Sequence, residues 1–232
     1  RVSTVPRSDA WVAAEFRNLA TTTDFYSVGA VEGSLGVTVA SATPHEITTG
    51  GANLYRFTMN DATSSASFVE STVVVQDNFA IATGTVALPT TELSVGGDFA
   101  NTGGNFMHNN STVRFTGGGT KTIEQQGTAF LNAFYDVRFT GSGDWTYVDA
   151  NATTTNTYTI ENGNVSFPSG SLTVGRDFVA SGSGSFDAND GEVVFLIEGP
   201  DQIASNGSDF HDVRIRQAAT STSGWFDNDW EQ

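Results

Sequence analysis

An internal repeat covers most of this chain and limits the folds that it can adopt. Residues 83–99 return as residues 162–178 in a constant register, since Val165 follows Val86 by 79 positions (165 − 86 = 79). The likeness continues downstream in matched aromatic pairs: Phe106 with Phe186, Phe115 with Phe195, and Phe134 with Phe210. A weaker third copy is visible upstream, around Leu54. Most of residues 47–216 is therefore a repeat of about 80 residues, present about two times, which is typical of an array of stacked units.

Short runs of alternating apolar and polar residues recur about every 8–12 residues within each copy, and Gly, Asn and Ser separate them. This pattern predicts an all-β protein, since alternation places large apolar side chains on one face of a strand. A β-sandwich would hide that face between two sheets, and a β-solenoid would stack it into interior ladders. We favour the solenoid, a parallel β-helix with rungs of about 20–27 residues and about three rungs per repeat. Phe106, Phe115, Phe186 and Phe195 are then expected to fill its interior.

Composition limits the possible partners. Lys and Arg total 10 against 26 Asp and Glu, for a formal net charge of −16, which disfavours nucleic acid and anionic membrane surfaces. No apolar stretch approaches the ~20 residues of a membrane span. The absence of cysteine excludes disulfides and thiolate metal sites. An acidic, Lys-poor, Thr- and Gly-rich β protein fits an extracellular or cell-surface location, and the start at Arg1 suggests a processed chain or a piece of a longer one.

The segment 1–29 carries a distinctive motif. Arg7 and Ser8 precede Trp11 and Glu15, and an aromatic Phe-Tyr strand pattern follows at residues 25–29. This segment resembles the closing segment of laminin-G-like (concanavalin-type) jelly-roll domains in large bacterial and archaeal surface proteins. The units that follow resemble the low-specificity repeats found after such domains. The resemblance implies a non-catalytic adhesive, sheath or surface-layer role and carries no catalytic residues.

Three regions are expected on this basis: residues 1–29 as the jelly-roll-like segment, 30–217 as the repetitive β domain, and 218–232 as an acidic aromatic tail. Independently of the resemblance, Ser8 or Asp9 is a plausible N-cap, and the residues after it predict a short amphipathic helix. Such a helix would cap the first rung, or the segment would insert into a neighbouring subunit.

Oxygen-rich positions are candidate chemical sites. Asp98 and Asp177 share a repeat position, as do Asp136 and Asp212, and we interpret them as turn acceptors of backbone N–H groups rather than as an acid/base pair. The sequence around Asp187, Asn189 and Asp190 has the composition of a calcium loop, but the aligned residues 107–112 have no acid, which favours an Asn/Asp turn. Calcium is the one candidate cofactor. The histidines at 45, 108 and 211 share no metal-ligand spacing.

The favoured function is a non-catalytic extracellular structural protein, a self-associating subunit of a surface layer, sheath, filament or adhesin stalk. The residues expected to mediate contact between copies are aromatic and lie near the two ends of the chain: Trp11, Phe16, Trp225, Phe226 and Trp230. The alternative is a polysaccharide-binding module that stacks sugars on exposed Trp145, Tyr147 and Tyr158. A polysaccharide-degrading β-helix enzyme is the least favoured hypothesis, because the recurring acids follow the repeat.

Overall fold

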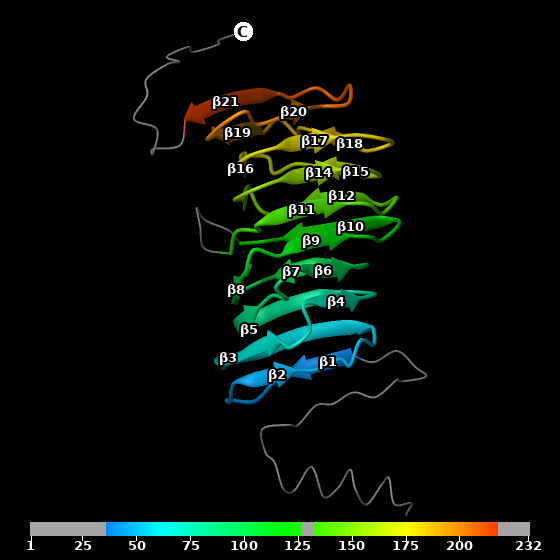
Figure 1. Ribbon diagram of the computed structural model, residues 1–232, viewed down its shortest axis with the longest axis vertical. Helices are drawn as coiled ribbons and strands as arrows, with labels where there is room; N and C mark the ends of the chain where they lie inside the picture. The colour runs from blue at the N-terminus through cyan, green and yellow to red at the C-terminus, as the bar shows by residue number, and fades with distance from the viewer. Residues whose placement is uncertain (1–35, 127–131, 218–232) are drawn as a thin grey trace, which may run out of the picture.

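A computed structural model describes residues 36–126 and 132–217, and every strand pair in this part of the chain is parallel. The chain winds into a β-solenoid of about 9 turns, with β1 (Gly36–Val39) in the first turn and β21 (Asp212–Gln217) in the last (Figure 1). The predicted all-β solenoid is thereby confirmed and the β-sandwich alternative is wrong. The predicted N-terminal helix lies outside the described residues and stays a prediction.

Three faces surround the interior, and the chain passes from one face to the next within each turn. The first face contains β1, the first half of β3 (Arg56–Phe68), the first half of β5 (Phe79–Ala87), β7 (Phe99–Asn101), β10 (Thr120–Glu124), β12 (Asp144–Tyr147), β15 (Asn164–Ser166) and β18 (Ser185–Asp187). The second face begins with β2 (His45–Ile47), the second halves of β3 and β5, and β8 (Asn105–Met107). It resumes with β13 (Asn151–Thr154), β16 (Ser171–Val174), β19 (Glu192–Ile197) and β21. The third face contains β4 (Thr72–Val75), β6 (Glu92–Val95), β9 (Thr112–Phe115), β11 (Asp136–Phe139), β14 (Tyr158–Ile160), β17 (Phe178–Ala180) and β20 (Ile203–Ala204).

The strand register gives the length of each turn. On the third face Thr72 lies against Glu92 and Glu92 against Thr112, so the chain advances by 20 positions per turn (92 − 72 = 20 and 112 − 92 = 20). The longest step on this face joins Phe178 to Ile203, 25 positions later (203 − 178 = 25). These steps lie within the range predicted for one rung, and the longer turns place their extra residues in the connections between strands.

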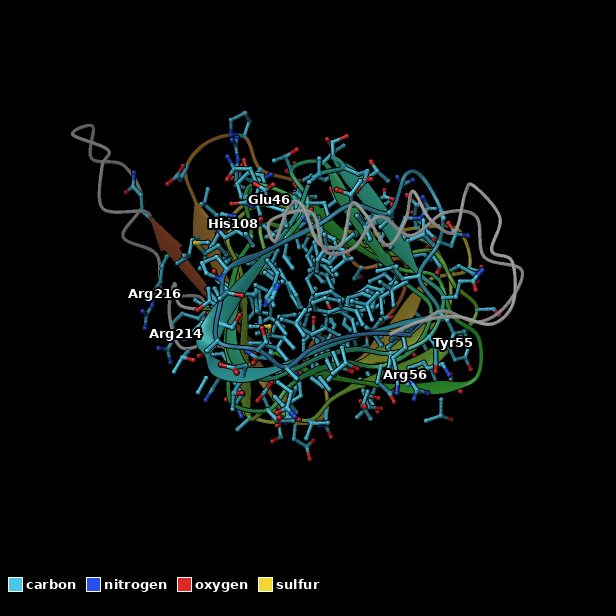
Figure 2. The ribbon with its side chains drawn as sticks, turned by 90° about the horizontal axis from the view of Figure 1, so that it is seen from below. Glu46, Tyr55, Arg56, His108, Arg214 and Arg216 are labelled. Atoms are coloured by element: carbon cyan, nitrogen blue, oxygen red, sulfur yellow. The ribbon has the colours of Figure 1, made fainter. Side chains whose placement is uncertain are left out.

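The interior consists of ladders of apolar side chains, seen end-on in Figure 2. Phe57 stacks on Phe79 with ring centroids 4.8 Å apart, and Phe79 stacks on Phe99 at 5.4 Å. Phe115 stacks on Phe139 at 4.9 Å in the same manner. These separations are close to the spacing of neighbouring strands, about 4.8 Å, so each ring lies directly over the ring of the turn below.

The four phenylalanines expected in the interior, Phe106, Phe115, Phe186 and Phe195, are all buried. Together with the ladders they form one continuous cluster that runs through the described part of the chain. The prediction that the recurring aromatic positions fill an interior column is therefore confirmed.

The repeat is not a whole number of turns. Val86 lies on the second face, where it pairs with Phe106, whereas its counterpart Val165 lies on the first face and pairs with Phe186. Phe99 likewise lies on the first face and its counterpart Phe178 on the third. The second copy is therefore displaced by one face, so that a repeat spans three turns and two further faces instead of the expected three rungs.

The second face is interrupted between β8 and β13, in the turn that contains the undescribed residues 127–131. Two side-chain amides take the place of a strand there. The Asn132 Oδ1 accepts the N–H of Phe106 at 2.8 Å, and its Nδ2 donates to the carbonyl of Gly104 at 3.3 Å, which satisfies the upper edge of β8. The side chain therefore presents one acceptor and one donor, as a backbone peptide would.

Gln125 does the same for the lower edge of β13. Its Oε1 accepts the N–H of Thr153 at 2.9 Å and its Nε2 donates to the Thr153 carbonyl at 2.7 Å. Gln125 is completely buried, and the Asp149 carboxylate accepts the backbone N–H of Gln125. The Asn101 Nδ2 donates to the Gln125 carbonyl at 3.0 Å, which extends this buried polar network into the turn below.

Glycines stack at the corner between the third and first faces. A Cβ at Gly117 would collide with the carbonyl oxygen of Gly96 below it, and one at Gly141 with the carbonyl of Gly117. The corner therefore requires glycine at these positions because backbone packs on backbone in successive turns.

Candidate functional site

The aromatic residues expected to bind sugars are part of the interior. Trp145 and Tyr158 are completely buried and Tyr147 nearly so, which overturns the prediction of an exposed stacking platform. The Trp145 ring lies 4.8 Å from that of Phe115 and 5.9 Å from that of Phe139, measured between centroids. A side chain that is completely buried cannot stack against a sugar.

The two buried tyrosines satisfy each other's hydroxyl groups. The Tyr158 hydroxyl donates to the Tyr147 hydroxyl at 3.3 Å. Burial raises the pKa of both phenols above its usual range, because the ionised form would lose its hydration. This pair therefore serves the core and remains neutral.

The recurring aspartates bind backbone amides of the next turn. The Asp98 Oδ1 accepts the N–H of Thr122 at 2.8 Å, and the Asp177 Oδ1 accepts the N–H of Gln202 at 2.7 Å. Asp136 plays a similar role for the N–H of Thr157, at 2.9 Å. These carboxylates lie in different turns and each supports its own corner, as the interpretation of turn acceptors predicts.

The candidate calcium loop forms a turn. Asn189 and Asp190 adopt left-handed backbone conformations, with φ of 51° and 58°. The Asp187 Oδ1 accepts the N–H of Asn189 at 2.9 Å, and the Asn189 Nδ2 donates to the carbonyl of Phe167 in the turn below at 3.0 Å. The aligned Asn109, with φ of 49°, donates in the same way to a carbonyl of the preceding turn.

This shared geometry, with and without acids, is that of an Asn/Asp turn, since these side chains tolerate left-handed backbone. Within residues 36–126 and 132–217 no cluster of three or more His, Asp or Glu side chains is arranged to hold a metal ion. Calcium binding at Asp187, Asn189 and Asp190 thus stays a prediction.

The histidines lie apart and have local partners. His45 lies 3.2 Å from the hydroxyl of Ser41, and His108 accepts the N–H of Asn110 at 3.0 Å through Nδ1. The ring of His108 also stacks on Tyr135 at 5.4 Å. Burial lowers the pKa of His108, because the protonated ring would be partly desolvated. The contact of His45 with Ser41 joins an imidazole to a hydroxyl, but it is exposed and, among the described residues, no carboxylate forms an ion pair with His45.

The feature that stands out as an interaction site is the last strand, β21. Its residues Val213 and Ile215 continue the inward-facing positions of Val193 and Phe195, which are buried one turn below. Val213 is nevertheless 45% exposed and Ile215 56% exposed. An apolar strand face exposed at the end of a stack is the kind of surface that another strand covers.

Charged side chains alternate with these apolar ones along β21. The Arg214 Nη2 lies 2.8 Å from the Glu192 carboxylate in the turn below. Arg216 is exposed, and within the described part of the chain no carboxylate forms an ion pair with it. Asp212 is also exposed, 3.6 Å from the ring of His211.

Sequence reasoning missed this strand as a site. A signal was present, since residues 212–214 repeat residues 136–138 and Val213 and Ile215 alternate with charged residues. The aromatic residues predicted to mediate contacts, Trp11, Phe16, Trp225, Phe226 and Trp230, lie outside the described residues, and that prediction is untested.

Comparison of the chain with protein-family models, with curated proteins and with solved structures found no match. Among the described residues there is also no helix of the length and apolarity that a membrane crossing requires. The function is therefore inferred from the chain's own sequence and geometry.

Proposed function

We propose that this chain is a non-catalytic structural protein of the cell exterior that associates with copies of itself, as a subunit of a surface layer, sheath, filament or adhesin stalk. The observation that carries the proposal is the exposed apolar face of β21, where Val213 and Ile215 occupy positions that are buried in the turn below. A rod of parallel strands has two ends, and an end that exposes apolar side chains favours assembly.

The use of polar groups along the rod supports a structural role. The recurring acids Asp98, Asp136 and Asp177 each accept backbone N–H groups at a corner. Most arginines of the described part form ion pairs on the surface, such as Arg138 with Glu161 at 2.8 Å and Arg56 with Asp77 at 2.7 Å. The side chains with catalytic potential are thus largely engaged by the fold itself.

The location on the cell exterior is supported by composition and by a resemblance. The chain carries a formal net charge of −16 and has no cysteine, and residues 1–29 resemble the closing segment of jelly-roll domains of surface proteins. The polysaccharide-binding alternative loses its proposed platform, because Trp145, Tyr147 and Tyr158 are buried.

Light scattering and negative-stain microscopy of the full chain over a range of concentrations test the proposal. We expect particles larger than one chain, whose share grows with concentration. Parallel samples with calcium and with a chelator show whether the turn at residues 187–190 contributes. A chain that stays monomeric at every concentration, with or without calcium, contradicts self-association.

A further inference from the structure

β21 has one unpaired edge. It ends the sheet order β13-β16-β19-β21, and among the described residues β19 is its single partner strand. Its residues alternate between exposed apolar side chains, Val213 and Ile215, and exposed arginines at positions 214 and 216. Figure 2 shows Arg214 and Arg216 projecting from the rim of the solenoid, away from its interior. The strand therefore presents both an apolar face and free backbone groups to a partner.

We propose that the partner is a second copy of this chain, whose β21 pairs antiparallel with this one across a twofold axis through Arg214. This inference rests on the proposed function of self-association and names its interface. In this register Asp212 of each copy lies opposite Arg216 of the other, and Val213 lies opposite Ile215. Residues directly opposite on antiparallel strands project to the same side, so the apolar pairs and the charged pairs each share one face.

The charge pattern of the strand fits this arrangement. Two Asp212–Arg216 pairs form at once, because a twofold axis repeats every contact. The two Arg214 side chains meet near the axis, and each is already neutralised by its Glu192 at 2.8 Å. With the twofold axis through Arg214, Asp212 of each copy faces the oppositely charged Arg216 of the other. A shift of the register by two residues toward the C-terminus would instead place Arg214 of one copy opposite Arg216 of the other, so that like charges would meet.

The first turn offers a poorer partner for this end. Its inward-facing residues Val37, Val39 and Ile47 are buried, in contrast to those of β21. Contact between two exposed apolar faces is therefore available between two C-terminal ends and not between a C-terminal and an N-terminal end. The pairing covers Val213 and Ile215 of both copies and adds backbone hydrogen bonds, as strand addition does elsewhere.

Charge reversal tests the register. The variants Asp212→Arg and Arg216→Asp each place like charges opposite one another in both symmetric pairs, so each alone should dimerise at least about tenfold more weakly. Mixing the two variants in equal amounts should restore dimers, because every Arg then faces an Asp. Sedimentation equilibrium of the full-length chain measures all three samples. Both side chains are exposed on a terminal strand, and circular dichroism checks that the fold is kept.

Glu46→Lys serves as the matched control. Glu46 is an exposed residue of β2, in the first turn of the same face, and its reversal should leave dimerisation unchanged. Weakening by Glu46→Lys would mean head-to-tail contact and would overturn the proposal. Wild-type chains that are monomeric but dimerise after deletion of residues 218–232 would show that this segment covers the edge, which also overturns it.

The outcomes separate this proposal from the proposed function. Assembly that both single variants leave unaffected refutes the β21 interface and preserves self-association. Discrete dimers that the single variants weaken and the mixture restores support the interface, and if they never grow further they contradict the filament or layer. Monomers in every sample, including the deletion, contradict both.

Discussion

Gln125 offers the sharpest test of how the interrupted face is held together. Replacing it with Met keeps a side chain of similar length but removes both hydrogen bonds to Thr153, at 2.9 and 2.7 Å. Because Gln125 is completely buried and Thr153 is largely so, water has little access to the freed N–H of Thr153, whereas the Thr153 carbonyl keeps the N–H of Phe134 at 3.1 Å. We expect Gln125→Met to destabilise the fold strongly.

The magnitude follows mainly from the Thr153 N–H, which loses its acceptor. A buried polar group left without a partner costs about 1–3 kcal/mol, and loss of the second bond to a carbonyl that keeps another donor costs about 0.5–1.5 kcal/mol, so Gln125→Met should cost about 1.5–4.5 kcal/mol. The neighbouring Gln126 provides the control. It is exposed and its Nε2 makes one hydrogen bond, to the Thr102 carbonyl at 2.9 Å, so Gln126→Met should cost about 1 kcal/mol or less.

Urea unfolding followed by circular dichroism and tryptophan fluorescence measures the difference. Since stacked repeats can unfold in parts, coincidence of the two signals should be checked before free energies are compared. If Gln125→Met and Gln126→Met unfold at the same urea concentration with equal slopes, the two hydrogen bonds do not support β13 and the reasoning is refuted.

Three further predictions concern the corners and the core. Gly117→Ala should destabilise the solenoid by about 2 kcal/mol, because the added Cβ would meet the carbonyl oxygen of Gly96. Gly118→Ala, whose Cβ would make an ordinary contact of 3.5 Å, should change the urea midpoint little. Equal effects of the two variants would contradict the stacking of backbone on backbone. Burial raises the pKa of Tyr147 and Tyr158, so the folded form keeps protons that the unfolded chain releases near pH ~10, and stability should fall as pH rises above that value. Tyrosinate absorbance of these two residues should therefore appear together with the loss of β circular dichroism, and complete ionisation of all tyrosines in an intact fold would refute this. Asp98→Ala should lower thermal stability by about 1 kcal/mol, because the Thr122 N–H loses its acceptor. Asp98→Asn retains an acceptor oxygen and should be nearly neutral. Equal losses in the two variants would mean that the charge of Asp98 matters more than its hydrogen bond.

Much of the fold was predictable because each turn of the solenoid requires the same pattern of inward-facing apolar residues. Alternation at Phe106, Phe115, Phe186 and Phe195 predicted an inward face, and all four are buried. The phase of the winding was not predictable, because strands on all three faces share one pattern and the offset between copies does not show where a turn closes. The role of Gln125 was equally hidden, since a single amide in a polar stretch gives no periodic signal.

The candidate sugar platform failed for a physical reason that the sequence contained. Trp145 and Tyr147 alternate with Asp144 and Thr146, and that pattern indicates a strand with the aromatic residues inward. Large aromatic side chains were interpreted as surface features when the alternation favoured burial. Asp98, Asp136 and Asp177 were interpreted correctly as turn acceptors, because an acid that returns beside each corner serves the corner. Asp212 shares the pattern but accepts no backbone N–H within the described residues.

The displacement of the repeat by one face has a consequence for how such a rod can lengthen. One added copy would extend it by about 18 Å, since three and two-thirds turns each rise about 4.8 Å. The same addition would rotate everything beyond it by about a third of a circle. Growth by whole copies therefore rotates the last strand about the long axis of the solenoid. Three successive insertions would return this strand to its original orientation.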